Sequence, residues 1–364
     1  VAHDKTRFVG VRGLMRQKLE EGDTETAMKL AEKAFALKPR HVETQDTLLR
    51  LQARDENWDG ARRVLSAKLK SGSLPKDVYK RWEAVLSLAD ARDQLRRGNV
   101  DKARAEMLEA NRLSPELVPA AVLAARAHIE AGEKRRAAKV LKIARAKTAH
   151  PDLAAAFAEI EPDETPEARI KRFQPFLKVA PDAPETKMLE AELYLAAEDF
   201  PGARRVLGKL YETHPTSRSL SLMAAIERGE GGSEAVVRGW LAKALSAPRG
   251  AQWVCDTCGT IHADWLPVCT NCEAFDSLSW KEPPTGGTPA AVSSDMLPLL
   301  MGPAVPDAGS SDPVPSVSDD EDVPEAEEVP PSSSEVEPTP PHVVNPAVVG
   351  TTRDQDETVS PPRI

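Results

Sequence analysis

Small and apolar residues recur along the first two-thirds of the chain at the spacing of a helix that buries one face. After Gly22, the sequence places Ala27, Ala31 and Ala34 on one side of a helix, because residues three and four apart share a face. Gly22 favours a left-handed cap at the end of the preceding helix, and Pro39 stops the helix that follows. This segment therefore predicts one helix held between a glycine turn and a proline.

The same pattern returns, and each copy carries a marker alanine near the start of its second helix. The markers are Ala27, Ala61, Ala103, Ala137, Ala168, Ala203 and Ala235. The intervals between them are 34, 42, 34, 31, 35 and 32 residues, which cluster on the 34-residue period of tetratricopeptide repeats. A helix pair of this length cannot bury its own apolar face, so pairs stack, and small side chains allow close crossing. An ordinary helical bundle with coincidental glycine and proline turns is the alternative.

Two copies are irregular. The 42-residue interval predicts an insertion near Gly72–Lys76, where the sequence resembles a loop. The copy at Ala168 is degenerate, because prolines stand at positions 162, 166, 175, 181 and 184. Its helices are therefore expected to be short or kinked.

The four cysteines of the chain form two Cys-x-x-Cys hooks, and no cysteine lies elsewhere. The first hook is Cys255 and Cys258, and the second is Cys269 and Cys272. Two such hooks at short range present four thiolates to one tetrahedral metal ion. Zinc is favoured for a closed structural site, and iron is the alternative for a four-sulfur site. His262 lies between the hooks and is expected near the site or on the surface, because four thiolates already complete a tetrahedron.

A thioredoxin-like redox pair is the competing interpretation of these cysteines. It needs a single Cys-x-x-Cys on a βαβ scaffold, and neither condition fits this sequence. Trp253 and Trp280 flank the hooks and are expected to shield the site from water. Glu273 follows the second hook where such a turn prefers glycine, so a distorted turn is expected there.

Charge divides the chain into three parts. Residues 1–150 carry 32 Lys and Arg against 21 Asp and Glu, residues 151–282 carry 14 against 21, and residues 283–364 carry 2 against 15. The last part is rich in Pro and Ser and has no Trp, Tyr or Phe, so it is predicted to be disordered. The predicted fold class is all-α: a tetratricopeptide-repeat superhelical solenoid over residues 1–248, a zinc-ribbon or rubredoxin-like metal knob over 249–282, and a disordered acidic tail over 283–364.

The sequence shows no catalytic motif, so no enzyme activity is predicted. Basic clusters at Arg62–Arg63, Arg96–Arg97 and Lys134–Arg136 fall at turns between paired helices and could form a positive edge facing lipid headgroups or RNA. Surface solubility is the simpler interpretation, and nucleic acid is disfavoured because no aromatic stacking platform accompanies the clusters. The sequence given contains no stretch of about 18 apolar residues, so a spanning helix is not predicted within it.

Two segments resemble the HemY family of bacterial haem-biosynthesis-associated proteins, in its cysteine-bearing form. They are Phe8–Leu14, followed by a repeat that ends at Pro39, and the Trp- and Cys-rich stretch Trp253–Trp280. The resemblance implies an inner-membrane protein whose soluble part faces the cytoplasm, linked to haem or porphyrin metabolism and attached through membrane helices that would lie upstream of Val1. The layout is also similar to lipopolysaccharide assembly protein B, and by that analogy the knob would pack near Trp240 and Leu245 on the last repeats.

The predicted function is a non-enzymatic, inner-membrane-associated scaffold. The concave face of the repeats would bind protein partners, and haem-pathway enzymes are the partners that the resemblance implies. One alternative is a rubredoxin-like electron-transfer or metal-handling protein. The other is a regulatory adaptor of the lipopolysaccharide-assembly type.

Overall fold

The computed structural model describes residues 2–284, with side chains from residue 6 onward, and this part is helical except for a small sheet. The helices are α1 (Ala2–Glu20), α2 (Thr24–Leu37), α3 (Val42–Arg54), α4 (Trp58–Lys70), α5 (Lys76–Arg96), α6 (Val100–Leu113), α7 (Val118–Glu130), α8 (Lys134–Arg145), α9 (Pro151–Ala158), α10 (Pro166–Leu177), α11 (Pro184–Ala196), α12 (Phe200–Leu207), α13 (Leu210–Thr213), α14 (Ser217–Gly229) and α15 (Glu234–Ser246). The strands are β1 (Gln252–Cys255), β2 (Ile261–His262) and β3 (Leu278–Lys281). The predicted tail over 283–364 lies outside the described residues, apart from its first two positions.

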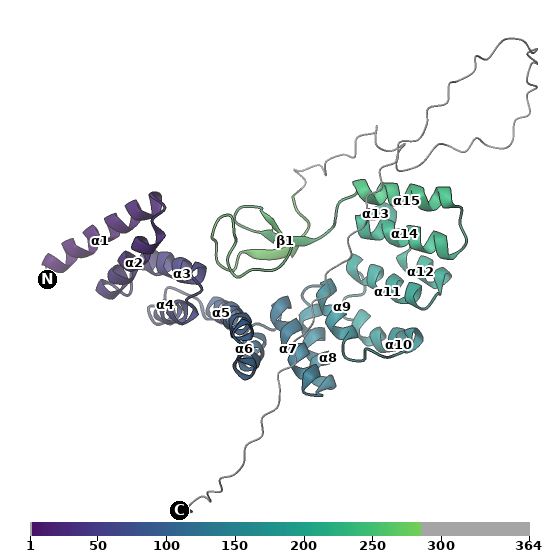
Figure 1. Cartoon of the computed structure of the whole chain (residues 1–364), viewed down its shortest axis with the longest axis horizontal. Coiled ribbons are helices and arrows are strands. Elements are labelled where there is room, and N and C mark those ends of the chain that lie inside the picture. The colour runs from purple at the N-terminus through teal and green to yellow at the C-terminus, as the bar shows by residue number, and fades with distance from the viewer. Residues whose placement is uncertain (1, 285–364) are drawn as a thin grey trace, which may run out of the picture. The chain divides into compact units, whose positions relative to one another are not determined.

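Consecutive helices pack as pairs in chain order, which confirms the predicted array of helical repeats (Figure 1). The pairs are α1–α2, α3–α4, α5–α6, α7–α8, α11–α12 and α14–α15. The copy with many prolines does not form a pair of its own: α9 is only eight residues long and packs on α7 and α8, whereas α10 packs on α11. Pro166 begins α10 and Pro175 lies inside it, so the expected irregularity is present.

Five of the marker alanines are fully buried where the two helices of a pair cross. They are Ala27, Ala61, Ala103, Ala137 and Ala203. Each stands four residues after the residue that caps its helix, as Ala27 follows the cap Asp23. The small side chain is needed there because the first helix of the pair passes close by.

The other two markers were assigned in the wrong phase, since Ala168 and Ala235 are exposed. In α15 the cap is Ser233, and the buried position four residues later is Val237, 34 residues after Ala203. In α10 the cap is Thr165, so the same position falls on Arg169. In the six regular copies the buried position therefore lies four residues after the capping residue, whereas Arg169 of the degenerate copy is only partly buried.

The extra residues of the 42-residue interval lengthen a helix and do not enlarge the loop where they were predicted. Helix α5 has 21 residues, whereas α3 and α7 have 13 each. Each of these helices ends in the same way, with a left-handed residue two positions on, at Glu56, Gly98 and Gly132. The additional eight residues therefore form two turns at the amino end of α5, from Lys76 to Glu83.

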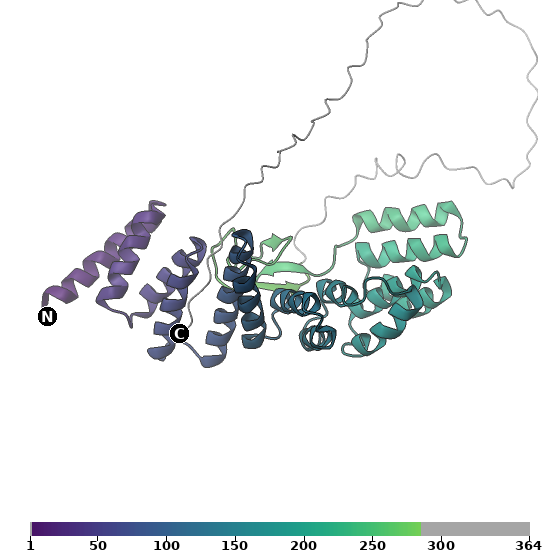
Figure 2. The same cartoon turned by 60° about the horizontal axis from the view of Figure 1, so that its bottom comes forward.

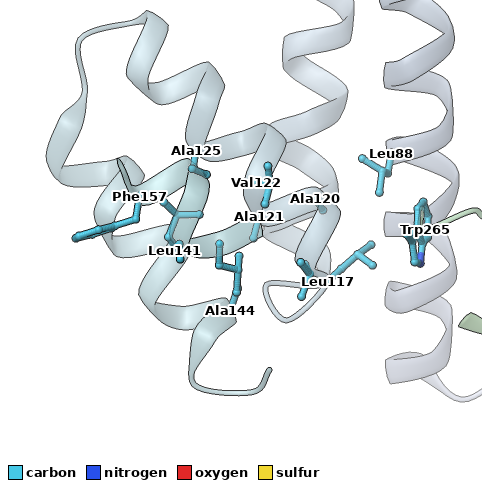
Figure 3. Packing of buried hydrophobic residues seen from close by; sticks show 14 of the residues in the cluster. Leu88, Leu117, Ala120, Ala121, Val122, Ala125, Leu141, Ala144, Phe157 and Trp265 are labelled. Atoms are coloured by element: carbon cyan, nitrogen blue, oxygen red, sulfur yellow. The ribbon is translucent and has the colours of Figure 1, made fainter. Parts of the chain in front are cut away.

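The cysteine-bearing segment forms a three-stranded antiparallel sheet in the order β2-β1-β3, which we call the knob (residues 249–282). Trp253 in the central strand pairs with His262 on one side and with Trp280 on the other. Figures 1 and 2 show these strands beside the middle helices of the array. Residues of α5, α7, α9 and α11 share one apolar cluster with Trp253, Trp265 and Leu278 of the knob. Figure 3 shows Trp265 next to Leu88 of α5 in this cluster.

The knob does not pack near Trp240 and Leu245, as the analogy had suggested. The ring of Trp240 lies against Tyr211, with ring centroids 5.2 Å apart, and the side chain of Leu245 is 60% exposed. The knob instead lies on α3, α5 and α7, the first helices of their pairs, and on the start of α9, so it covers part of the face that we expected to be open to a partner. The two added turns of α5 supply two of the side chains that it contacts, Arg81 and Trp82, and Arg92 further along α5 contacts Trp265.

Candidate metal centre

The first hook is a tight turn at the end of the central strand. Cys255 closes β1, and its amide donates to the carbonyl oxygen of Thr260 at 2.9 Å. The amide of Gly259 donates back to the carbonyl oxygen of Cys255 at 2.9 Å, and Gly259 has a φ of +73°. Glycine suits this position because a left-handed backbone costs it little.

The second hook repeats this geometry without glycine. The amide of Glu273 donates to the carbonyl oxygen of Cys269 at 3.0 Å, as Gly259 does to Cys255. Glu273 has a φ of +56°, so it adopts the conformation that glycine has in the first hook. The expected distortion is absent from this turn, and the unfavourable backbone conformation falls on Glu273 itself.

The two hooks bring all four thiols to one point. The four sulfur atoms of Cys255, Cys258, Cys269 and Cys272 lie within 4.8 Å of one another. Cys255 Sγ is 3.6 Å from Cys272 Sγ, and Cys258 Sγ is 3.7 Å from Cys269 Sγ. A zinc–sulfur distance of about 2.3 Å places neighbouring sulfurs of a tetrahedron about 3.8 Å apart. The four thiols therefore fit one tetrahedral metal ion.

The electrostatics of the thiols also favour a bound cation. Hydrogen bonds from the hydroxyl and amide of Thr260 lower the pKa of Cys258 to about 5. The Ala274 amide favours the thiolate of Cys272, but burial and the three neighbouring sulfurs raise the pKa of this thiol to about 12. Four thiolates cannot all ionise at this separation unless a cation offsets their repulsion.

Polar and aromatic groups surround the thiols. His262 Nε2 lies 3.4 Å from Cys269 Sγ, so the histidine is a neighbour of the cluster, as predicted. The hydroxyl of Ser277 lies 3.3 Å from Cys255 Sγ. Of the two flanking tryptophans, Trp253 is buried and Trp280 is partly buried in the apolar cluster that includes Cys255 and Cys269. Trp265, which lies between the hooks, is buried in the same cluster.

A histidine of the array, which no motif in the sequence singles out, joins this aromatic shell. The His150 ring centroid is 4.0 Å from that of Trp280 and 5.2 Å from that of Trp253. Its Nδ1 accepts a hydrogen bond from the amide of Asp152 at 3.1 Å and so caps α9. Burial lowers the pKa of His150 to about 4, so the ring is neutral when it packs on the knob.

Two carboxylates fasten the knob to the array. Asp276, whose side chain is 7% exposed, accepts hydrogen bonds from Arg81 Nε and Nη2 at 2.9 to 3.2 Å. Glu273 accepts one from Arg54 Nη1 at 2.9 Å. Between them the ring of Phe275 meets that of Trp82 edge to face, at 5.6 Å. No local pattern in the sequence points to these residues, although Arg81 and Trp82 lie within the 42-residue interval that breaks the repeat period.

The predicted basic edge is largely neutralised. Arg62 pairs with Glu106 at 2.6 Å and with Glu83 at 3.2 Å. Lys134 pairs with Glu161 at 2.7 Å. Carboxylates also lie within ion-pair distance of Arg96, Arg97 and Arg136. Most of the basic side chains of these three clusters are therefore paired with carboxylates of the array.

Comparisons with known proteins do not assign this chain to a family. No family model matches this sequence. The probable magnetosome protein Mms48 of Magnetospirillum gryphiswaldense is 26% identical over 226 residues, which cover 61% of this chain and 50% of that protein. The chain thus spans about half the length of this curated relative.

Two solved structures show distant similarity over most of their length. A tetratricopeptide repeat protein from Parabacteroides merdae is 14% identical, with a TM-score of 0.31, over 65% of this chain and 98% of its own. PilF of Pseudomonas aeruginosa is 15% identical, with a TM-score of 0.26, over 67% of this chain and 90% of its own. The helix pairs described above, and not these likenesses, define the fold.

Proposed function

We propose that this protein is a non-enzymatic interaction scaffold that binds protein partners on the first-helix face of its array, and that the metal knob is an integral part of that face. The observation that carries the proposal is the buried ion pair between Arg81 and Asp276, which joins the knob to α5. A detached electron carrier would not need this contact. Repeat arrays present long surfaces of this kind to peptides and helices.

An open groove supports this proposal. It has a volume of about 540 Å³ and lies between α3 and the knob, bounded by Trp82 and Phe275. The other lining residues come from α3, among them Val42, Thr47 and Arg50. Such a mixture of apolar surface and a few polar groups suits a peptide better than a small, enclosed substrate.

We assign the four thiols to one structural zinc ion. Zinc would hold the two hooks together and give a knob with a very small core its folding energy. Iron is the alternative, and the exposure of Cys258 favours it, because an exposed ligand edge permits electron exchange. Elemental analysis decides between them: one zinc per colourless chain supports the scaffold, whereas a coloured protein with a reversible redox wave supports electron transfer.

The finer assignments rest on resemblance alone. Haem-pathway partners and inner-membrane attachment are proposed from the HemY resemblance, and a regulatory adaptor is proposed from the layout of lipopolysaccharide assembly protein B. None of the described helices is long and apolar enough to cross a bilayer. Capture of partners from isolated membranes would test these assignments together.

The scaffold itself is tested by site-specific photo-crosslinking in cells. A crosslinker replaces Thr47 in the groove of one variant and the exposed Lys102 on α6 of a matched control. The proposal expects a discrete product from position 47 that position 102 does not give. The same products from both positions, or none from position 47, would contradict it.

A further inference from the structure

The knob loop Glu273–Asp276 is held by the array in the way that a bound peptide would be. We propose that the surface of α3 and α5 beneath this loop is a peptide-recognition site for a partner segment that carries an aromatic side chain between two carboxylates, and that the loop occupies it as an internal ligand. This inference rests on the proposed scaffold function and names the chemistry of its partner.

Three side chains of the array contact three side chains of the loop. Arg81 holds Asp276 through two nitrogens, and Arg54 holds Glu273. Trp82 packs edge to face on Phe275 between the two ion pairs. A guanidinium that donates two parallel hydrogen bonds selects a carboxylate by geometry as well as by charge. The site therefore specifies an acid, an aromatic and an acid in that order along a short segment.

The backbone of the loop shows that these side chains are not incidental. Among the described residues of the knob, the non-glycine residues with positive φ are Glu273 at +56° and Asp276 at +49°. These are also the two residues whose carboxylates reach the array. Glycine would fit both turns with less strain, as Gly259 does in the first hook. At both positions the contact of the carboxylate with an arginine of the array offsets this backbone cost.

The site continues beyond the loop. The groove of about 540 Å³ is lined by Phe275, Trp82 and the stretch of α3 from Val42 to Arg50. The two acids in the groove wall are already paired, Glu43 with Arg16 and Asp46 with Lys68. A partner that displaced the loop could therefore extend into a groove that the loop leaves empty.

The test measures binding of a labelled peptide with the sequence of residues 273–279 to the full chain by fluorescence anisotropy. The unaltered chain keeps its site occupied, so it should bind weakly. A chain with Glu273→Gln and Asp276→Asn keeps all four cysteines but loses the charges that hold the loop. It should bind the peptide about tenfold tighter or more, since apparent affinity rises with the fraction of open sites.

Two further variants make the result specific. Adding Arg81→Ala to the loop variant should abolish the gain, because the peptide then loses its main carboxylate partner. Asp256→Asn is the matched control: Asp256 also lies in the knob, but its carboxylate contacts Ser279 and Lys281 within the knob. This control should bind the peptide as the unaltered chain does.

The tethered loop has an effective concentration of about 1 mM at its site, so a free peptide should bind the opened site within that range. The proposal is overturned if the loop variant binds no peptide up to this concentration. It is also overturned if binding survives Arg81→Ala or equals that of the control. Failure here with a retained crosslink from position 47 would leave the scaffold function in place. Loss of both would remove the scaffold as well.

Discussion

The ion pair between Arg81 and Asp276 should contribute more to stability than any exposed pair of the array, and this can be measured. Asp276 is 7% exposed and Arg81 is 29% exposed at their side chains. Removing one partner of a fully buried pair costs about 3–5 kcal/mol. Because Arg81 is partly in water, we expect a smaller cost, about 2 kcal/mol, for Asp276→Asn, with a coupling energy of about 1–2 kcal/mol between the two positions.

Hydrogen exchange is the suitable assay, because repeat arrays often unfold in parts and a single melting temperature then has no clear meaning. If release of the knob opens the first two turns of α5, the amide hydrogens of these turns should exchange about 30-fold faster in Asp276→Asn, in Arg81→Gln and in the double variant. A double-mutant cycle on the exposed ion pair of Arg126 and Glu159, whose side chains are 46% and 40% exposed, serves as the control. Its coupling should stay below about 1 kcal/mol. Equal coupling in the two cycles would refute our account of how the knob is held.

Three further predictions concern the cysteine cluster, the end of α11 and the buried histidine. Cys255→Ser should lower bound metal well below one ion per chain by mass spectrometry and should remove exchange protection from α5, whereas full metal with unchanged protection would exclude a structural site. Glu198 has a φ of +57° at the end of α11, so Glu198→Gly should stabilise the array by about 0.5–1 kcal/mol in urea, while Glu190→Gly in the middle of α11 should destabilise it by a similar amount. The pKa of His150 is lowered to about 4, so the folded state disfavours protonation of this ring. The stabilisation should be complete above about pH 6.5 and should fall by up to about 3 kcal/mol as the pH drops through 4. His150→Gln should flatten this pH dependence when unfolding is followed by tryptophan fluorescence.

The local features of this fold could be predicted from the sequence because each depends on neighbouring residues. Glycine turns, buried alanines and the cysteine hooks are short patterns whose geometry is fixed within about one helix pair. The phase errors at Ala168 and Ala235 arose where capping residues moved the buried position by one or two residues.

The placement of the knob could not be predicted in the same way. Arg81 and Asp276 are separated by 195 positions, and no local pattern links them. Their pairing depends on the combined packing geometry of several helix pairs. The one trace of it in the sequence was the 42-residue interval, which we had assigned to a loop because Gly72 and Pro75 are typical turn residues.

The two added turns of α5 bear on how homologues of this protein should differ in sequence. Residues 76–83 carry Arg81 and Trp82, which meet the cysteine-bearing segment, although Val78 and Tyr79 of the same turns also pack on the array. A homologue that lost its cysteines would keep an Arg81 with only the more distant Glu116 and Ser114 as partners and a Trp82 ring without Phe275, so selection on these two side chains would relax. Across diverged genomes, this arginine and tryptophan and the paired hooks should therefore be inherited or lost together.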